Sequence, residues 1–282
     1  MLKLIECPRD AMQGLHEFIP TELKVNYLKA LLEVGFDSLD CGSFVSWKAI
    51  PQMRDTAEVI QEISNINSNT KLLTIVANLR GAEEAMKFSG IQYLGFPFSI
   101  SETFQLRNTN STIQESVSRV GEIQQLCQTH NKELVVYISM GFGNPYGDHW
   151  SANVVEEWVD QLAGLGIRIF SLSDTVGVSS PDNIAYLFSH LIKKYPDLEI
   201  GAHLHTQTYN WEEKIHSAYT NGCRRFDSAM LGFGGCPMAK DELTGNMSTE
   251  NVLKYLMDKC IDHGLELDKF AKAREIALNV FP

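Results

Sequence analysis

The sequence lacks several features that mark special classes of protein. Its 282 residues carry a net charge of −11 and contain no run rich in lysine or arginine, so the basic surface typical of nucleic-acid binding is missing. No stretch approaches the roughly 18 consecutive apolar residues of a membrane span. We therefore expect a protein that binds neither nucleic acid nor membrane.

The chain also lacks a cysteine pattern. Its six cysteines are scattered and no two form a C-x-x-C pair, which argues against a disulfide scaffold and a zinc ribbon. The first residues, "MLKLIECPRD", lead directly into a strand-like pattern without a signal or transit segment. From these two observations we expect a cytoplasmic protein.

What the chain contains is a regular alternation of short β-rich runs and amphipathic helical patterns. The expected strands are 2–6, 38–41, 71–78, 91–96, 133–139, 167–173, 198–204 and 224–230. Each precedes an expected helix, at 21–35, 54–64, 81–89, 112–130, 151–165, 181–194, 210–221 and 249–264. Eight βα units predict an α/β fold, a (β/α)8 TIM barrel, as a single domain over residues 1–282. We expect residues 265–282 to form a C-terminal helical extension that closes over the barrel.

Helix-boundary residues support this assignment. N-caps are expected at Thr21, Ser151, Ser180, Asn210 and Thr249. Left-handed C-caps are expected at Gly35, Gly166, Gly222 and Gly264. An open doubly wound sheet is the alternative fold, but it would normally carry a glycine-rich fingerprint after the first strand, and "ECPRDAMQG" is not one.

Polar residues follow the carboxyl ends of the expected strands, where a barrel of this type forms its active site. They are Arg9, Asp10, Asp40, Asn78, Asp174, Thr175, His203 and His205, and strand 8 runs through Asp227 into a glycine-rich loop. His203 and His205 stand two positions apart, so a strand would present both on one face. Acids and imidazoles crowded together are costly to bury unless paired or bound to an ion, so the set predicts a metal site.

Several segments resemble, in order and spacing, the motifs of the 3-hydroxy-3-methylglutaryl-CoA lyase family. These segments are "ECPRDAMQG", "DSLDCGSFVSWKAIPQM", "SDTVGV", "HLH" and "GFGGCPMA…GN". The resemblance implies a metal held by Asp10, His203, His205 and Asn246, Arg9 as an electrostatic catalyst and Cys236 as the thiol of a mobile loop. It also implies an acyl-CoA substrate and a homodimer.

The ligand types suit a six-coordinate Mg²⁺ or Mn²⁺. Zn²⁺ held by Asp10, His203, His205 and Cys236 is the alternative, although a thiolate bound to zinc could not act as an acid. We predict retro-Claisen cleavage of a 3-hydroxyacyl thioester in which Asp10 or His203 is the base. Asp40 and Asp174 would orient substrate or metal-bound water, and Asn78 and Thr175 would line the cofactor site.

The sequence departs from the family pattern at several positions, which bears on the identity of the substrate. Ala11 replaces a glycine, Asp40 a glutamate and Thr206 an aspartate, Met140 stands where cysteine is frequent, and the last loop is one residue longer. Two other functions stay open. One is a synthase that condenses acetyl-CoA with a 2-oxo acid, and the other is a barrel that binds acyl-CoA or metal without turnover.

Overall fold

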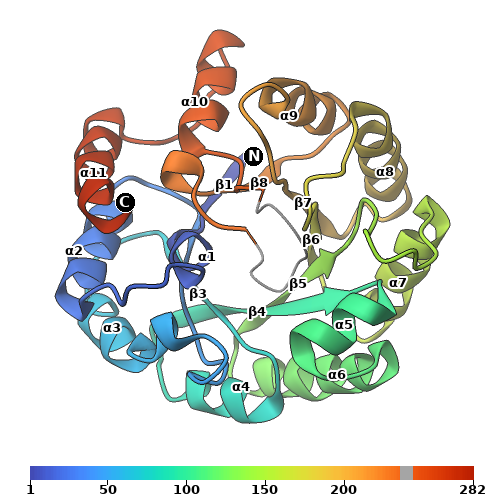
Figure 1. The fold of residues 1–282 in the computed structure, drawn as a ribbon, viewed down its shortest axis with the longest axis horizontal. Helices are drawn as coiled ribbons and strands as arrows, with labels where there is room; N and C mark the ends of the chain where they lie inside the picture. Colours follow the sequence, from blue (N-terminus) through green and yellow to red (C-terminus); the bar gives the residue numbers. More distant parts are fainter. Residues whose placement is uncertain (236–243) are drawn as a thin grey trace.

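The computed structural model describes residues 1–235 and 244–282. Eight parallel strands close into a barrel in chain order from β1 to β8, with helices around them (Figure 1). The strands are β1 (Lys3–Glu6), β2 (Ser38–Ser43), β3 (Lys71–Ile75), β4 (Ile91–Ser99), β5 (Glu133–Ser139), β6 (Ile169–Ser173), β7 (Glu199–His203) and β8 (Arg225–Ser228). The predicted TIM barrel is confirmed.

The helices surround the strands, except that α1 lies at the mouth of the barrel inside the ring (Figure 1). They are α1 (Pro8–Gln13), α2 (Thr21–Leu32), α3 (Thr56–Ile63), α4 (Leu79–Met86), α5 (Glu102–Thr109), α6 (Ile113–Thr129), α7 (Ala152–Gly164), α8 (Pro181–Lys194), α9 (Trp211–Thr220), α10 (Thr249–Asp258) and α11 (Leu267–Val280). Two short 3-10 helices, η1 (Pro51–Met53) and η2 (Met230–Gly232), complete the described elements. The sequence did not predict α1 or α5, and both lie beside the mouth of the barrel.

The expected C-terminal helix is present as α11, but it packs against α2 at the side of the barrel (Figure 1). Phe281 follows α11, and its ring meets Tyr27 of α2 edge-on and stacks on Phe233, with ring centroids 5.9 and 4.9 Å apart. None of the helices in the described parts of the chain has the length and apolar character needed to cross a membrane.

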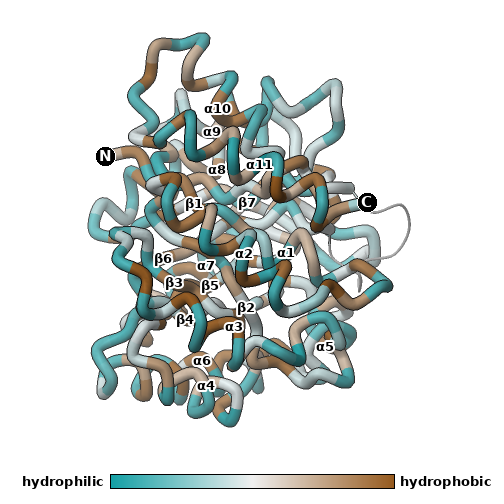
Figure 2. Tube along the Cα trace, turned by 90° about the vertical axis from the view of Figure 1, so that its left-hand side faces the viewer, coloured by the Kyte–Doolittle hydropathy of each residue, from teal (hydrophilic) through white to brown (hydrophobic). Residues whose placement is uncertain are grey.

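Alternation along the strands builds two hydrophobic layers. Val136 of β5 belongs to the large core between strands and helices, while Val135 and Tyr137 belong to a small cluster inside the barrel with Leu73 and Ile75 of β3. Because successive side chains of a strand point to opposite faces, both layers come from the same strands. Figure 2 shows that hydrophobic segments concentrate in the interior and hydrophilic ones at the outer turns.

Two of the predicted N-caps are confirmed by their hydrogen bonds. The hydroxyls of Ser151 and Ser180 accept hydrogen bonds from backbone N–H groups in the first turns of α7 and α8. Asn210 occupies the N-cap of α9 but does not cap it, because its side chain accepts from the N–H of Gln207. Thr21 and Thr249 are the first helical residues, so their predicted N-caps are wrong by one position.

The end of α10 differs from the prediction for a physical reason. The helix stops at Asp258, and Cys260 takes the left-handed conformation with φ of 52°. The N–H groups of Cys260 and Ile261 then bond the carbonyls of Met257 and Leu256, which is the Schellman pattern. Gly264 also has a positive φ, but it lies beyond this cap and does not end the helix.

Candidate active site and metal centre

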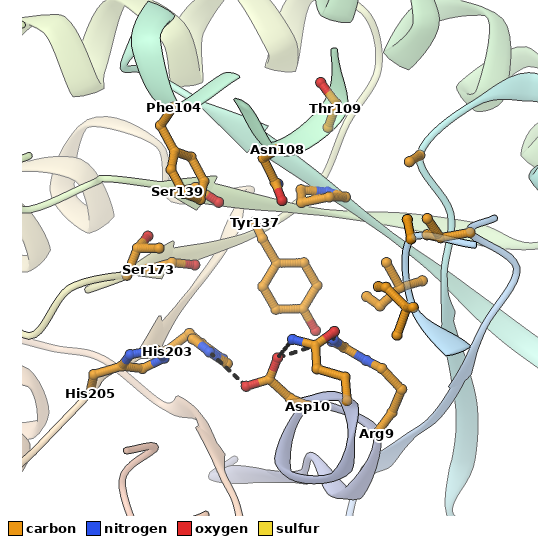
Figure 3. A pocket seen from close by; sticks show the side chains of 18 residues that line it. Arg9, Asp10, Phe104, Asn108, Thr109, Tyr137, Ser139, Ser173, His203 and His205 are labelled. Atoms are coloured by element: carbon orange, nitrogen blue, oxygen red, sulfur yellow. Dashed lines mark hydrogen bonds and ion pairs between the residues drawn. The ribbon is translucent and has the colours of Figure 1, made fainter. Parts of the chain in front are cut away.

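A cavity of about 140 Å³ opens at the carboxyl ends of the strands (Figure 3). Its walls differ in character. The connection after β2 and the ends of β3 and β4 contribute mainly apolar side chains, among them Val45, Ile50 and Ile75. The other side is polar and comes from α1 and from the ends of β5, β6 and β7.

Arg9 and Asp10 stand on α1, which starts at Pro8 immediately after β1. The Nε of Arg9 lies 3.2 and 3.0 Å from the two carboxylate oxygens of Asp40, and its Nη2 donates to Asp40 Oδ2 at 2.5 Å. Its Nη1 donates to Asp10 Oδ1 at 3.0 Å (Figure 3). Asp40 lies behind Arg9 and does not line the cavity. The guanidinium is therefore fixed between two buried carboxylates.

The charges in this cluster stabilise one another. Burial opposes the charge of Arg9, but Asp40 and Asp10 outweigh it and raise the pKa of the guanidinium. Burial raises the pKa of Asp40 to about 6 although Arg9 lowers it. Burial also raises the pKa of Asp10, but Arg9, His203 and His205 bring it below its ordinary value. Asp10 is thus an ionised carboxylate at neutral pH.

Gln13 is a member of the cluster that the sequence did not identify. Its amide oxygen accepts from Arg9 Nη1 at 2.8 Å, and its nitrogen donates to Asp10 Oδ1 at 2.9 Å. Residues three and four apart on a helix are neighbours, so a predicted helix over "PRDAMQ" would have placed Gln13 beside both.

His203 ends β7, and His205 follows it on the same side, as the spacing predicted. One ligand atom from each histidine and one carboxylate oxygen of Asp10 lie within 4.8 Å of one another. The Nε2 of His203 is 4.0 Å from Asp10 Oδ2, and the two imidazole centroids are 5.4 Å apart. This is the arrangement that a shared cation would need.

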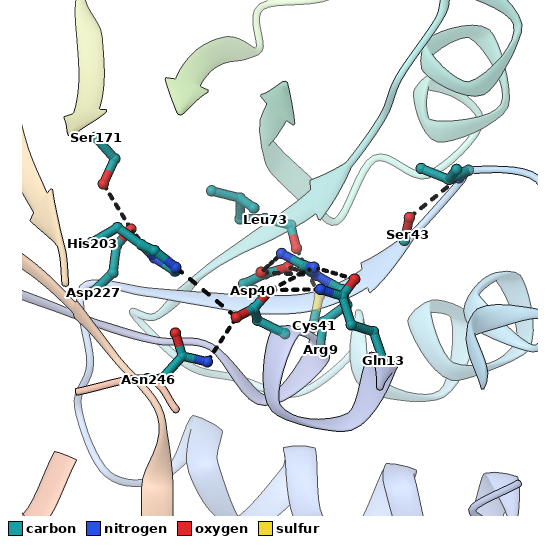
Figure 4. Close-up of polar contacts among 12 residues, drawn as sticks. Arg9, Gln13, Asp40, Cys41, Ser43, Leu73, Ser171, His203, Asp227 and Asn246 are labelled. Atoms are coloured by element: carbon teal, nitrogen blue, oxygen red, sulfur yellow. Dashed lines mark hydrogen bonds and ion pairs between the residues drawn. The ribbon is translucent and has the colours of Figure 1, made fainter. Parts of the chain in front are cut away.

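The hydrogen bonds of the two rings fit such a cation. His203 Nδ1 lies 3.2 Å from Asp227 Oδ2 (Figure 4). That carboxylate favours the Nδ1–H form and leaves Nε2 free on the Asp10 side. His205 is 3% exposed and its Nδ1 has no hydrogen-bond partner in the described part of the chain. Burial and the neighbouring His203 lower the pKa of His205 to about 4, so this ring is neutral at pH 7. A neutral buried imidazole with an unused nitrogen is suited to metal binding.

Asn246 reaches the same place from the segment before α10. It forms an isolated antiparallel bridge with His205, and its Nδ2 donates to Asp10 Oδ2 at 2.7 Å and to the Phe233 carbonyl at 3.0 Å. The structure therefore brings Asp10, His203, His205 and Asn246 together. In this arrangement the amide nitrogen of Asn246 faces the carboxylate.

A second group, Cys7, His203 and Asp227, also has metal-ligand spacing. It fits a cation less well, because burial and nearby carboxylates raise the pKa of the Cys7 thiol well above its usual range. A thiol that keeps its proton is a poor ligand. Asp227 instead acts through its hydrogen bond to His203.

Two predicted cofactor-site residues lie elsewhere. Ser173 and Thr175 line the cavity, so Asp174 between them points to the opposite side, where its carboxylate accepts from Lys214 and Ser179. Asn78 follows Ala77, which lines the cavity, and its side chain caps α4 through the N–H of Gly81. The alternation of side chains after a strand explains both corrections.

Thr175 does line the cavity, and its hydroxyl accepts from the N–H of Met140 at 2.8 Å. Cys236 lies outside the described residues. Asn108 and Thr109 of α5 and Tyr137 of β5 also line the cavity, and the sequence did not point to them. The Tyr137 ring meets His203 edge-on, with centroids 5.7 Å apart.

Lys214 is a further residue that the sequence did not identify. It is 1% exposed, and its Nζ donates to Asp174 Oδ2 at 2.8 Å, to the Gly177 carbonyl at 3.2 Å and to the His205 carbonyl at 3.0 Å. The ammonium of α9 therefore joins the segment after β6 to the backbone of a candidate metal ligand.

Comparisons with known proteins agree with this geometry. A family model described as HMGL-like matches residues 3–277. The cytoplasmic 3-hydroxy-3-methylglutaryl-CoA lyase of Mus musculus is 30% identical over 275 residues, which cover 97% of this chain and 79% of the relative. The mitochondrial hydroxymethylglutaryl-CoA lyase of Mus musculus is 31% identical over 274 residues, which cover 96% and 83%.

Solved structures give the same result. The hydroxymethylglutaryl-CoA lyase of Pseudomonas aeruginosa superposes with a TM-score of 0.91 at 29% identity, covering 99% of this chain and 92% of that one. An HMG-CoA lyase from Acenitobacter baumannii, in complex with coenzyme A and 3-methylmalate, gives a TM-score of 0.90 at 28% identity, covering 99% and 91%.

Proposed function

Because the chain belongs to the HMGL-like family and is a carbon–carbon lyase, we propose that it cleaves a 3-hydroxyacyl-CoA with the help of Mg²⁺ or Mn²⁺. The substrate would be hydroxymethylglutaryl-CoA or a related branched thioester, and the products acetyl-CoA and a keto acid. The observation that carries the proposal is the convergence of Asp10, His203 and His205 beside the Arg9 guanidinium. The names of the relatives support the substrate class.

The cation would be held by Asp10, His203 and His205, with Asn246 beside them. One carboxylate and two imidazoles leave positions for substrate oxygens and suit a divalent ion that prefers oxygen and nitrogen ligands. When bound, the cation polarises the hydroxyl of the substrate and lowers the pKa of that group.

The side chains would then carry out the cleavage. Asp10 and His203 are the candidates for the base that takes the hydroxyl proton. The C2–C3 bond breaks, its electron pair passes to C2 and gives a thioester enolate, and C3 becomes a carbonyl carbon. Arg9 keeps its charge and would stabilise the enolate oxygen, a contribution that is strongest where water is excluded. Asp40 would hold the Arg9 guanidinium in place through its paired hydrogen bonds.

The enolate must then gain a proton at C2 to give acetyl-CoA. We assign this proton to the Cys236 thiol, as the family resemblance implies. Replacing Cys236 by serine should leave substrate binding intact and lower the turnover number.

The test is an assay of the purified protein with hydroxymethylglutaryl-CoA and Mg²⁺ or Mn²⁺, beside other branched 3-hydroxyacyl-CoA thioesters. Metal-dependent formation of acetyl-CoA and a keto acid is the expected result. If hydroxymethylglutaryl-CoA gives no acetyl-CoA while another of these thioesters is cleaved, the proposed substrate is wrong and the proposed type of reaction is right.

Two results would support the other functions. Release of free thiol from acetyl-CoA with a 2-oxo acid would indicate a synthase, and tight acyl-CoA binding without product would indicate a binding protein. The cytoplasmic location and the homodimer stay predictions, for cell fractionation and light scattering to test.

A further inference from the structure

A line of charged side chains, from the half-buried Glu199 to the buried Arg225 and Asp227, runs through the barrel along β7 and β8. Arg225 and Asp227 stand two positions apart on β8, so both point to the barrel interior. Arg225 Nη1 donates to Glu199 Oε1 at 3.0 Å, and its Nε lies 4.0 Å from Asp227 Oδ1. Asp227 Oδ2 in turn lies 3.2 Å from His203 Nδ1 and accepts from Ser171 at 2.9 Å. The line thus ends at a candidate metal ligand.

The neighbouring strand has a glycine where the arginine needs space. A Cβ at Gly201 of β7 would lie 2.7 Å from Cδ, 2.8 Å from Cγ and 3.0 Å from Cβ of Arg225. Real Cβ atoms essentially never approach heavy atoms more closely than 3.0 Å, so any other residue at 201 would displace the arginine side chain. The position of the Arg225 side chain therefore requires a glycine at residue 201.

Hydrogen bonding alone does not explain why an arginine is buried here. Arg225 is 1% exposed, yet its Nε and Nη2, and the facing Oδ1 of Asp227, have no hydrogen-bond partner within the described residues. A buried ion pair with unused donors contributes little to stability in comparison with apolar side chains of similar volume. A role in orienting Asp227 accounts for the retained charge.

We propose that Arg225 is a positioning residue of the metal site. Its charge holds one oxygen of Asp227, so that the other oxygen stays against His203 Nδ1 and leaves Nε2 directed to the side of Asp10. Without that charge, the carboxylate could turn away from the ring. The inference rests on the metal dependence that we propose for the reaction.

The experiment measures Mn²⁺ binding to the purified full-length protein by electron paramagnetic resonance. Partners that orient a ligating histidine typically change metal affinity by about 10- to 100-fold when removed. We expect Arg225→Met to weaken Mn²⁺ binding by about this factor and Arg225→Lys to restore part of it. Gly201→Ala should weaken Mn²⁺ binding as well, because the added Cβ displaces the side chain of Arg225. This variant keeps every charged group. Lys3→Met, which removes the half-buried cation on the other oxygen of Glu199, should bind Mn²⁺ as the wild type does.

The free energy of unfolding of each metal-free variant is measured beside its Mn²⁺ affinity. A variant that loses affinity but keeps its stability has lost the orientation of the site and not its fold. Equal Mn²⁺ affinity in the wild type, Arg225→Met and Gly201→Ala would overturn the role of Arg225 and leave the proposed metal site intact. If Arg225→Met does not fold, the result with Gly201→Ala decides the question. A wild-type protein that binds no Mn²⁺ would overturn the metal site itself, and this inference with it.

Discussion

Glu6 offers a quantitative test of the electrostatics of this barrel. The residue ends β1, is completely buried, and accepts hydrogen bonds from the Met230 N–H at 2.7 Å and the Thr249 hydroxyl at 2.5 Å. Burial raises its pKa from 4.5 to about 8, although both hydrogen bonds lower it. Glu6→Gln keeps the shape of the side chain and its ability to bond both partners, but removes the titrating proton.

The sign of the effect follows from the protons bound in each state. Between pH 4.5 and pH 8 the folded protein keeps the Glu6 proton, whereas the unfolded chain has lost it, so the free energy of unfolding falls as pH rises. Each pH unit corresponds to about 1.4 kcal/mol, so the full interval corresponds to about 5 kcal/mol. Above pH 8 both states are ionised and the dependence on Glu6 ends.

Urea unfolding of the wild type and Glu6→Gln at several pH values measures this contribution. We expect the variant to become more stable than the wild type by an amount that grows between pH 4.5 and pH 8 toward about 5 kcal/mol. Glu122→Gln, at an exposed position of α6, is the matched control and should change the pH dependence little. Parallel stability curves for the wild type and Glu6→Gln would refute the reasoning.

Three further changes test the active site. Arg9→Met should lower kcat by about 10²- to 10³-fold because the enolate oxygen loses its cation, and near-normal cleavage by the folded variant would remove Arg9 from the reaction. Lys214→Met should lower the free energy of unfolding by about 3–5 kcal/mol because Asp174 is left buried without its cation. Adding Asp174→Asn should recover part of the loss in a urea titration, and equal losses in both variants would contradict this pairing. Chelation by EDTA should abolish cleavage, and Mn²⁺ at about 100 times its Kd should raise the free energy of unfolding by about 2.7 kcal/mol, whereas full activity in EDTA would exclude metal dependence.

The sequence predicted the eight strands and the helices that follow them, because each carries its own periodic pattern. It did not predict α1 or α5, which have six and eight residues. The six residues of α1 span too few turns to show a helical period. The helix α5 is as long as α3 and α4, which the sequence did predict, but its only large apolar residues are Phe104 and Leu106, so it shows no apolar face. Both helices contribute side chains to the cavity, so the missed elements are also the ones that shape the site.

The sequence predicted which residues lie near the candidate site, but it did not predict which way each side chain points. Residues after strand ends meet at the mouth of a barrel, which correctly brought Asp10, His203 and His205 together. The same reasoning placed Asp174 in the cavity, although Ser173 and Thr175 line it and the side chain between them must point away. Applied to β8, the same alternation of faces would have found Arg225 together with Asp227.

The two halves of the barrel interior have different roles, which explains the place of the metal site. Inside the barrel, β3, β4 and β5 contribute the apolar cluster that contains Leu73 and Tyr93. On the opposite side, β7 and β8 contribute His203, Arg225 and Asp227. The attraction between two charges is strongest where the surroundings screen it least. The apolar half of the interior therefore strengthens the ion pairs of the polar half. Arg9 reaches the same cavity as apolar Ile50 and Ile75, where its charge can stabilise an oxyanion with little competition from water.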